Sequence, residues 1–282
     1  MKIIYVNNIM QTVKNQLNLA FNDKKKWNVF DNKILNELSS FKILKKIGEK
    51  SVYGSIYEID NKQKYVVKIM KVDDSMKKKI FFNELRIGSA KRIKNFGTPI
   101  FAYTKINPKW YAYIMEHVLD GKQTSIPLTL DEYMKHNPIY SQKLKSNLKI
   151  KYSPNIFMHL AKTLSIFYKQ TQGFHGDLHL GNIMVVLNKD TSIAKVVIID
   201  YGTWTAFQNP LSQQATINTS LRHAHYEWRL LNINIENTFW KRASKGYIRS
   251  NLNTLSVWFQ GVHIPTGNPF AGVLNQMMLA TR

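Results

Sequence analysis

Three side chains that could hold a metal ion and orient a reacting hydroxyl occur close together in the second half of the chain. The octapeptide at 175–182 reads HGDLHLGN and supplies Asp177 and Asn182, five residues apart. Asp200 follows 18 residues later, at the start of the tripeptide DYG at 200–202. Carboxylate and amide oxygens are ligands that Mg²⁺ prefers, and a further carboxylate can orient an attacking hydroxyl. This set of residues is typical of phosphoryl transfer.

Two short strands are predicted to place these residues. Apolar and β-branched side chains at 182–187 and 194–199 predict a hairpin. The loop that carries Asp177 and Asn182 then precedes the first strand, and Asp200 follows the second. Because a hairpin brings its two open ends together, we expect the three oxygen-bearing side chains to converge on one spot.

The elements around this hairpin change in character along the chain. Residues 1–40 have apolar positions at helical spacing and predict an N-terminal helical extension. The next segment is rich in strands and the later one in helices. Strands are predicted at 41–47, 55–59, 64–70, 100–105 and 110–116, and helices at 75–94, 129–136 and 154–172.

The order of these parts resembles the protein-kinase-like superfamily. HGDLHLGN and DYG are similar to the family's catalytic loop H-R-D-x-x-x-x-N and metal motif D-F-G. The resemblance implies that Asp177 is the catalytic base, that Asn182 and Asp200 hold Mg²⁺, and that the cofactors are ATP and Mg²⁺. His175, in contrast, is expected to be a structural, hydrogen-bonded core histidine.

The fold that this resemblance implies is α+β and bilobal. A small antiparallel β-rich N-lobe at 41–118 would follow the N-terminal helical extension at 1–40. A mainly α-helical, shortened C-lobe would occupy 119–282.

Other kinase parts occur in the family's order. Gly48 and Gly54, with Ser51 between them, resemble the glycine-rich loop over the ATP phosphates, although their spacing departs from G-x-G-x-x-G. Lys68, in the stretch YVVK, resembles the third-strand lysine that contacts the α- and β-phosphates. Glu84 is its expected ion-pair partner, because it is the only acid in the helix predicted after that strand.

The stretch YAYIMEHVLDG at 111–121 resembles the hinge that binds adenine. The resemblance implies that Met115 is the gatekeeper and that the backbones of Glu116 and Val118 bind the adenine edge. The apolar side chains expected to sandwich the ring are Ile56, Val66 and Met184.

Three departures from the family pattern bear on the substrate. Gly176 replaces the arginine of H-R-D, which removes a partner for an activation-loop phosphate. His179 stands where Ser/Thr kinases usually have lysine, and no A-P-E motif occurs among the 80 residues after Gly202.

The prediction favoured by these motifs is a Ser/Thr protein kinase that transfers the γ-phosphate of ATP to a protein hydroxyl. Two alternatives stay open. Gly176 and His179 are also similar to small-molecule phosphotransferases of the aminoglycoside and choline kinase type. The altered glycine loop and the high positive charge motivate a pseudokinase that acts as a basic binding or structural module.

Composition bounds the environment and the partners. The 282 residues include 40 Lys and Arg against 18 Asp and Glu, a net charge of +22, and 29 of the cations lie in residues 1–151. The stretch 203–226 contains no acid, so an acidic or phosphorylated protein substrate is expected, and nonspecific association with nucleic acid is a second hypothesis.

Other classes are excluded by the same composition. A hydrophobic share of 44% argues against disorder of the whole chain, and the absence of cysteine excludes disulfides and thiolate chemistry. We expect no membrane span and no secretion signal, and therefore an intracellular protein. The Lys-, Asn- and Ile-rich composition suggests an AT-rich genome, as in large DNA viruses.

Overall fold

The computed structural model describes residues 2–47, 54–59, 64–119, 125–134, 150, 153, 155–171 and 173–206. The chain forms two compact units, each described by itself below. The first comprises Met1–Lys94 and Thr98–Gln123, and the second Asn95–Gly97 and Thr124–Arg282. Both combine antiparallel strands with helices, so the fold class is α+β, as the sequence predicts.

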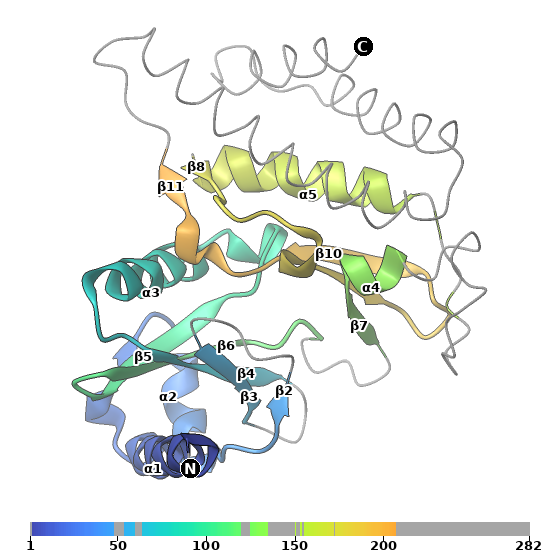
Figure 1. Cartoon of the computed structure of the whole chain (residues 1–282). Coiled ribbons are helices and arrows are strands. Elements are labelled where there is room, and N and C mark those ends of the chain that lie inside the picture. Colours follow the sequence, from blue (N-terminus) through green and yellow to red (C-terminus); the bar gives the residue numbers. More distant parts are fainter. Residues whose placement is uncertain are drawn as a thin grey trace, which may run out of the picture. The chain divides into compact units, whose positions relative to one another are not determined.

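The first unit is built on an antiparallel sheet (Figure 1). Its strand order is β1-β5-β6-β4-β3-β2. The strands are β1 Asn28–Val29, β2 Lys46–Ile47, β3 Gly54–Glu58, β4 Tyr65–Lys71, β5 Ile100–Asn107 and β6 Trp110–Glu116. The helices are α1 Lys2–Phe21, α2 Lys33–Glu37 and α3 Ser75–Gly88, with 3-10 turns η1 Lys24–Lys26, η2 Leu38–Ser40 and η3 Ile93–Asn95.

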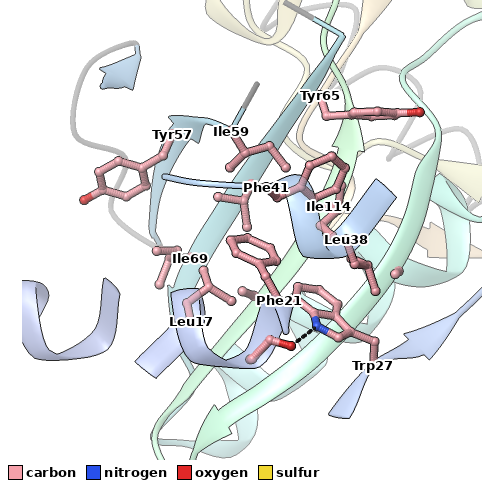
Figure 2. Packing of buried hydrophobic residues seen from close by; sticks show 14 of the residues in the cluster. Leu17, Phe21, Trp27, Leu38, Phe41, Tyr57, Ile59, Tyr65, Ile69 and Ile114 are labelled. Atoms are coloured by element: carbon pink, nitrogen blue, oxygen red, sulfur yellow. Dashed lines mark hydrogen bonds between the residues drawn. The ribbon is translucent and has the colours of Figure 1, made fainter. Parts of the chain in front are cut away.

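Helices α1 and α2 cover one face of this sheet. Alternate residues of a strand point to opposite faces, so Val67 and Ile69 of β4 point to this side with Ile114 of β6. Leu17 and Phe21 of α1 are buried against them, as Figure 2 shows. The N-terminal segment therefore shares one hydrophobic core with the strands.

The indole of Trp27 closes the end of this core. Its ring stacks on Phe21 with a centroid distance of 5.5 Å, and Nε1 donates a hydrogen bond of 2.9 Å to the carbonyl of Ala20 (Figure 2). The one polar atom of a buried tryptophan is thereby satisfied, which avoids a desolvation cost.

Helix α3 covers the other face of the sheet. Asp74 begins the helix, because its side chain accepts a hydrogen bond of 2.7 Å from the backbone N–H of Lys77. Phe81 and Leu85 point inward, toward Met70 of β4 and Tyr113 of β6.

Two predicted elements are shorter than expected. The helix predicted at 75–94 ends at Gly88, where a β-carbon would lie 2.4 Å from the side chain of Ile100, so glycine permits a close approach to β5. Within the strand predicted at 41–47, only Lys46–Ile47 (β2) pairs with β3 as a regular ladder. The N–H of Leu44 still bonds to the Glu58 carbonyl at 2.7 Å, while Phe41 turns into the core.

The second unit contains a hairpin and a long helix. Strands β9 Ile183–Leu187 and β10 Ile193–Ile198 form the predicted hairpin, in the order β10-β9-β7, and α5 Ile156–Thr171 contacts β10. Thr129 and Glu132 exchange hydrogen bonds in a capping box that begins α4. The remaining elements are β7 Ile126–Thr129, α4 Leu130–Met134, β8 Gly173–Phe174, η5 Leu180–Asn182, η6 Tyr201–Thr203 and β11 Thr205–Ala206. Within the described ranges, no helix has the length and apolar character needed to cross a bilayer.

Candidate active site

Lys68 and Glu84 form a buried ion pair in the first unit. Nζ of Lys68 lies 2.7 Å from Oε1 of Glu84, and the two side chains are 5% and 3% exposed. Lys68 points to the face of β4 that α3 covers, because its neighbours Val67 and Ile69 point to the opposite face. Glu84 lies on the inward side of α3, one turn after Ile80.

Tyr113 completes this network from β6, and the sequence reasoning missed it. Its hydroxyl donates a hydrogen bond to Oε2 of Glu84, and Lys68 Nζ lies 5.9 Å from its ring centroid. Tyr113 is the register partner of Lys68 in the β4–β6 pair. That pairing is the signal that could have identified Tyr113, since paired residues lie on the same face of a sheet.

The residues predicted to contact adenine lie on neighbouring strands of the same sheet. Val66 is paired with Met115 in the β4–β6 ladder, and Ile56 with Lys68 in the β3–β4 ladder. Gly54 begins β3, where a β-carbon would lie 2.6 Å from the carbonyl oxygen of Ile69. Gly48 and Ser51 fall outside the described residues.

Glu116, at the end of β6, is held by two interactions. Its side chain is 8% exposed and forms a 3.1 Å ion pair with Lys94. Its backbone N–H donates a 2.8 Å hydrogen bond to Pro99. Val118 follows in a turn and is half-buried.

In the second unit, Asn182 is tied to the loop that carries Asp177. Nδ2 of Asn182 donates a 2.8 Å hydrogen bond to the backbone carbonyl of Asp177. The amide nitrogen must face that carbonyl, which orients the side-chain oxygen of Asn182 for another use. The Asp177 side chain is 49% exposed, and Nε2 of His179 lies 3.8 Å from its Oδ2.

Asp200 is brought beside Asn182 by the predicted hairpin. Ile198 pairs with Ile183, and the N–H of Ile199 donates a 3.0 Å hydrogen bond to the carbonyl of Asn182. Asp200 itself has a left-handed backbone, with φ 65° and ψ 68°. Such backbones are uncommon outside glycine and concentrate at functional positions. Met184, the residue predicted to lie under adenine, is in β9 and half-buried.

The buried imidazole of His175 braces this arrangement. Nδ1 accepts a hydrogen bond of 3.3 Å from the N–H of Asp177, and Nε2 is 2.9 Å from the carbonyl of Ile199. A nitrogen that accepts leaves the other to donate, so the ring is neutral with its proton on Nε2. The prediction of a structural, hydrogen-bonded core histidine is confirmed.

Burial lowers the pKa of His175 below its ordinary value of 6.5, and this outweighs the bond to Ile199 and the charges of Asp200 and Asp177, which act in the opposite direction. The unfolded chain then takes up a proton that the folded chain does not. We therefore expect stability to fall as the pH drops below about 6.5, with a contribution of up to about 1.4 kcal/mol per pH unit. Urea midpoints at several pH values should show this slope, reduced in His175→Gln. Equal slopes in the two proteins would contradict the assignment.

Gly176 explains why this chain departs from H-R-D. Its φ is +83°, and a β-carbon there would lie 2.5 Å from the carbonyl oxygen of Thr203. The hydroxyl of Thr203 also donates a 2.8 Å hydrogen bond to the carbonyl of His175. The segment after Asp200 thus lies directly against the loop before Asp177, where an arginine could not adopt this backbone without strain.

Substitution of Gly176 by alanine should destabilise the folded chain by about 1–3 kcal/mol, through the positive φ and the contact with Thr203. The expected result is a lower urea midpoint with an unchanged slope. Gly181→Ala is the matched control, because its new methyl group would meet the side chain of His179, which can move. Equal midpoints for the two variants would contradict this explanation.

The oxygen ligands in the second unit fit Mg²⁺. Asn182 offers an amide oxygen and Asp200 a carboxylate, both hard donors, on backbones joined by the Ile199–Asn182 bond. Among the described residues, no group of three or more His, Cys, Asp or Glu side chains could hold a metal. One carboxylate and one amide suit an ion that keeps waters and substrate phosphates as its remaining ligands.

Comparisons with known proteins found similarity among solved structures. No family model matches the chain, and neither does any curated protein. The structure of WbdD aligns with 83% of this chain at 13% identity and a TM-score of 0.47, and the chain spans 45% of WbdD's length. The structure of the Cydia pomonella granulovirus kinase PK-1 aligns at 16% identity and a TM-score of 0.43. The alignment covers 81% of this chain and 82% of the PK-1 chain.

Proposed function

We propose that this chain is a kinase-like phosphotransferase that uses Mg-ATP, and that its acceptor is a Ser or Thr hydroxyl of a protein. The observation that carries the proposal is that hydrogen bonds hold Asp177, Asn182 and the residue before Asp200 together in the second unit. Asn182 bonds to the backbone of Asp177, and Ile199, next to Asp200, bonds to the backbone of Asn182. The buried Lys68–Glu84 pair supports it independently.

Each residue has a distinct part in this proposal. The carboxylate of Asp177 orients the acceptor hydroxyl and takes its proton, as the hydroxyl oxygen bonds to the γ-phosphorus and the bond to the ADP oxygen breaks. Asn182 and Asp200 hold Mg²⁺, which when bound neutralises phosphate charge. Lys68, fixed by Glu84, contributes a positive charge for the α- and β-phosphates.

Charge supports a protein acceptor that is acidic or already phosphorylated. The stretch 203–226 has no Asp or Glu, so it offers nothing to hold a basic peptide. The net charge of +22 on the whole chain favours nonspecific contact with nucleic acid. Such binding would weaken steeply as the salt concentration is raised.

The test is transfer of labelled γ-phosphate from Mg-ATP by the purified full chain, with a peptide library and a panel of small hydroxyl compounds assayed side by side. Acidic Ser and Thr peptides should be labelled preferentially. Labelling confined to small molecules would establish the aminoglycoside- or choline-kinase type of acceptor instead. A chain that labels nothing, including itself, and binds no Mg-ATP would overturn the enzyme assignment in favour of a pseudokinase.

A further inference from the structure

We propose that Tyr113 is a positioning residue, whose hydroxyl keeps the Lys68–Glu84 pair assembled in the absence of any ligand or modification. This inference rests on the proposed function for its catalytic meaning. Its structural content concerns three buried side chains from three elements: β4, α3 and β6. Tyr113 is 1% exposed, Glu84 2% and Lys68 4%.

The two carboxylate oxygens of Glu84 accept hydrogen bonds from different donors. Oε1 accepts from Nζ of Lys68 and Oε2 accepts from the hydroxyl of Tyr113. Loss of a hydrogen-bond donor destabilises a buried carboxylate, because that oxygen has already given up its contacts with water. Two donors on different strands also fix the rotation of the carboxylate, which a single flexible lysine cannot do.

The rigidity of the donor also matters. A tyrosine hydroxyl is placed by two torsions, and this ring is wedged against Phe81 of α3 at a centroid distance of 5.9 Å. Tyr113 is also the register partner of Lys68, so the ladder between β4 and β6 sets the spacing of both donors. Helix α3 is thereby held to the sheet at Glu84 by a polar contact as well as by the packing of Phe81.

Two tyrosine variants can separate the role of the Tyr113 hydroxyl from the packing of its ring. Tyr113→Phe keeps the ring and its contact with Phe81 and removes the hydroxyl. Tyr111→Phe is the matched control, because Tyr111 lies on the same strand and face and packs on Phe81 at 5.1 Å, without a bond to Glu84. A role in packing alone predicts the same behaviour for both variants.

The experiment measures how fast an amine-reactive ester modifies Lys68 in the full chain without nucleotide, with mass spectrometry of peptides as the readout. A charge-assisted hydrogen bond of about 1.5–3 kcal/mol predicts a rise of about tenfold or more at Lys68 in Tyr113→Phe. The rate in Tyr111→Phe should equal that of the wild type. The exposed Lys109 serves as the internal reference in every variant.

Two results would overturn the proposal. An unchanged rate at Lys68 in Tyr113→Phe would show that the hydroxyl does not hold the pair. A rise at Lys68 that is shared by both tyrosine variants, relative to Lys109, would reflect general loosening of the fold.

Kinetics then link the residue to catalysis. Tyr113→Phe should lower kcat, and in a Glu84→Gln background it should have no further effect, because the hydroxyl acts through Glu84. Additive losses would overturn this link. A chain without any transfer activity would sink the proposed function and leave the labelling of Lys68 to decide the structural claim.

Discussion

Replacing Asp200 with alanine should lower the rate of Mg-ATP-dependent phosphoryl transfer by at least about 10²–10³-fold. Asp200 is the carboxylate beside Asn182, so its loss removes the charged half of the expected metal ligand set. Removal of one preorganised electrostatic group of this kind typically costs on the order of 10²–10³-fold in turnover. The measurement is the rate of labelled phosphate transfer, together with the Mg²⁺ dependence of nucleotide binding.

The left-handed backbone of Asp200 makes a second variant necessary as a control. Alanine is disfavoured at φ 65°, so a lost activity could reflect a distorted turn. Asparagine tolerates this conformation and has nearly the same size. Asp200→Asn should therefore retain the urea midpoint of the wild type while losing transfer and Mg²⁺-dependent binding. An active Asp200→Asn would contradict the metal role.

Asp177→Asn supplies the complementary comparison. Asparagine cannot accept a proton as a base, so turnover should fall by about 10²–10⁴-fold. Asp177 makes its bonds to Asn182 and His175 through its backbone, which the substitution leaves in place. Nucleotide binding should hence change little. A parallel loss of binding would assign Asp177 to the ligand set instead.

The second large effect is expected at the Lys68–Glu84 pair. Removal of one partner takes away the opposite charge of a buried ion pair, which typically costs about 3–5 kcal/mol of folding stability. Lys68→Met and Glu84→Leu should each lower the urea midpoint sharply and also remove transfer. Equilibrium unfolding of the full chain at pH 7 provides the measurement.

Replacing all three members of the network separates stability from catalysis. A chain carrying Lys68→Met, Glu84→Leu and Tyr113→Phe has neither a charge nor a hydroxyl at these three positions. It should recover most of the stability lost by the single variants, yet remain inactive. Recovery of transfer along with stability would refute the role of Lys68. Failure to recover stability would show that packing of α3, rather than uncompensated charge, governs the single variants.

Local patterns in the sequence were sufficient for much of the fold. Runs of apolar and β-branched residues placed the hairpin that brings Asn182 and Asp200 together, and both strands lie within one residue of their predicted bounds. The Lys68–Glu84 contact was implied by the family resemblance, and Glu84 was the only acid in the predicted helix.

The features that sequence missed depend on contacts between distant segments. The role of Tyr113 requires the register between β4 and β6, and the backbone of Asp200 has no signature in its own residue type. In the sequence, Gly176 was interpreted only as the loss of an arginine. Its positive φ and the close approach of Thr203 show that the backbone there requires glycine. The end of α3 at Gly88 likewise depends on Ile100, twelve residues later.

The burial of α1 against β4 and β6 has a consequence for synthesis. Leu17 and Phe21 leave the ribosome first, but their partner Ile114 emerges almost a hundred residues later. A nascent chain that ends before β6 lacks a central strand of the sheet, so the apolar side of α1 stays uncovered until that strand arrives. Such long-range closure slows folding and prolongs exposure of apolar surface. This unit should therefore mature only after β6 has been made.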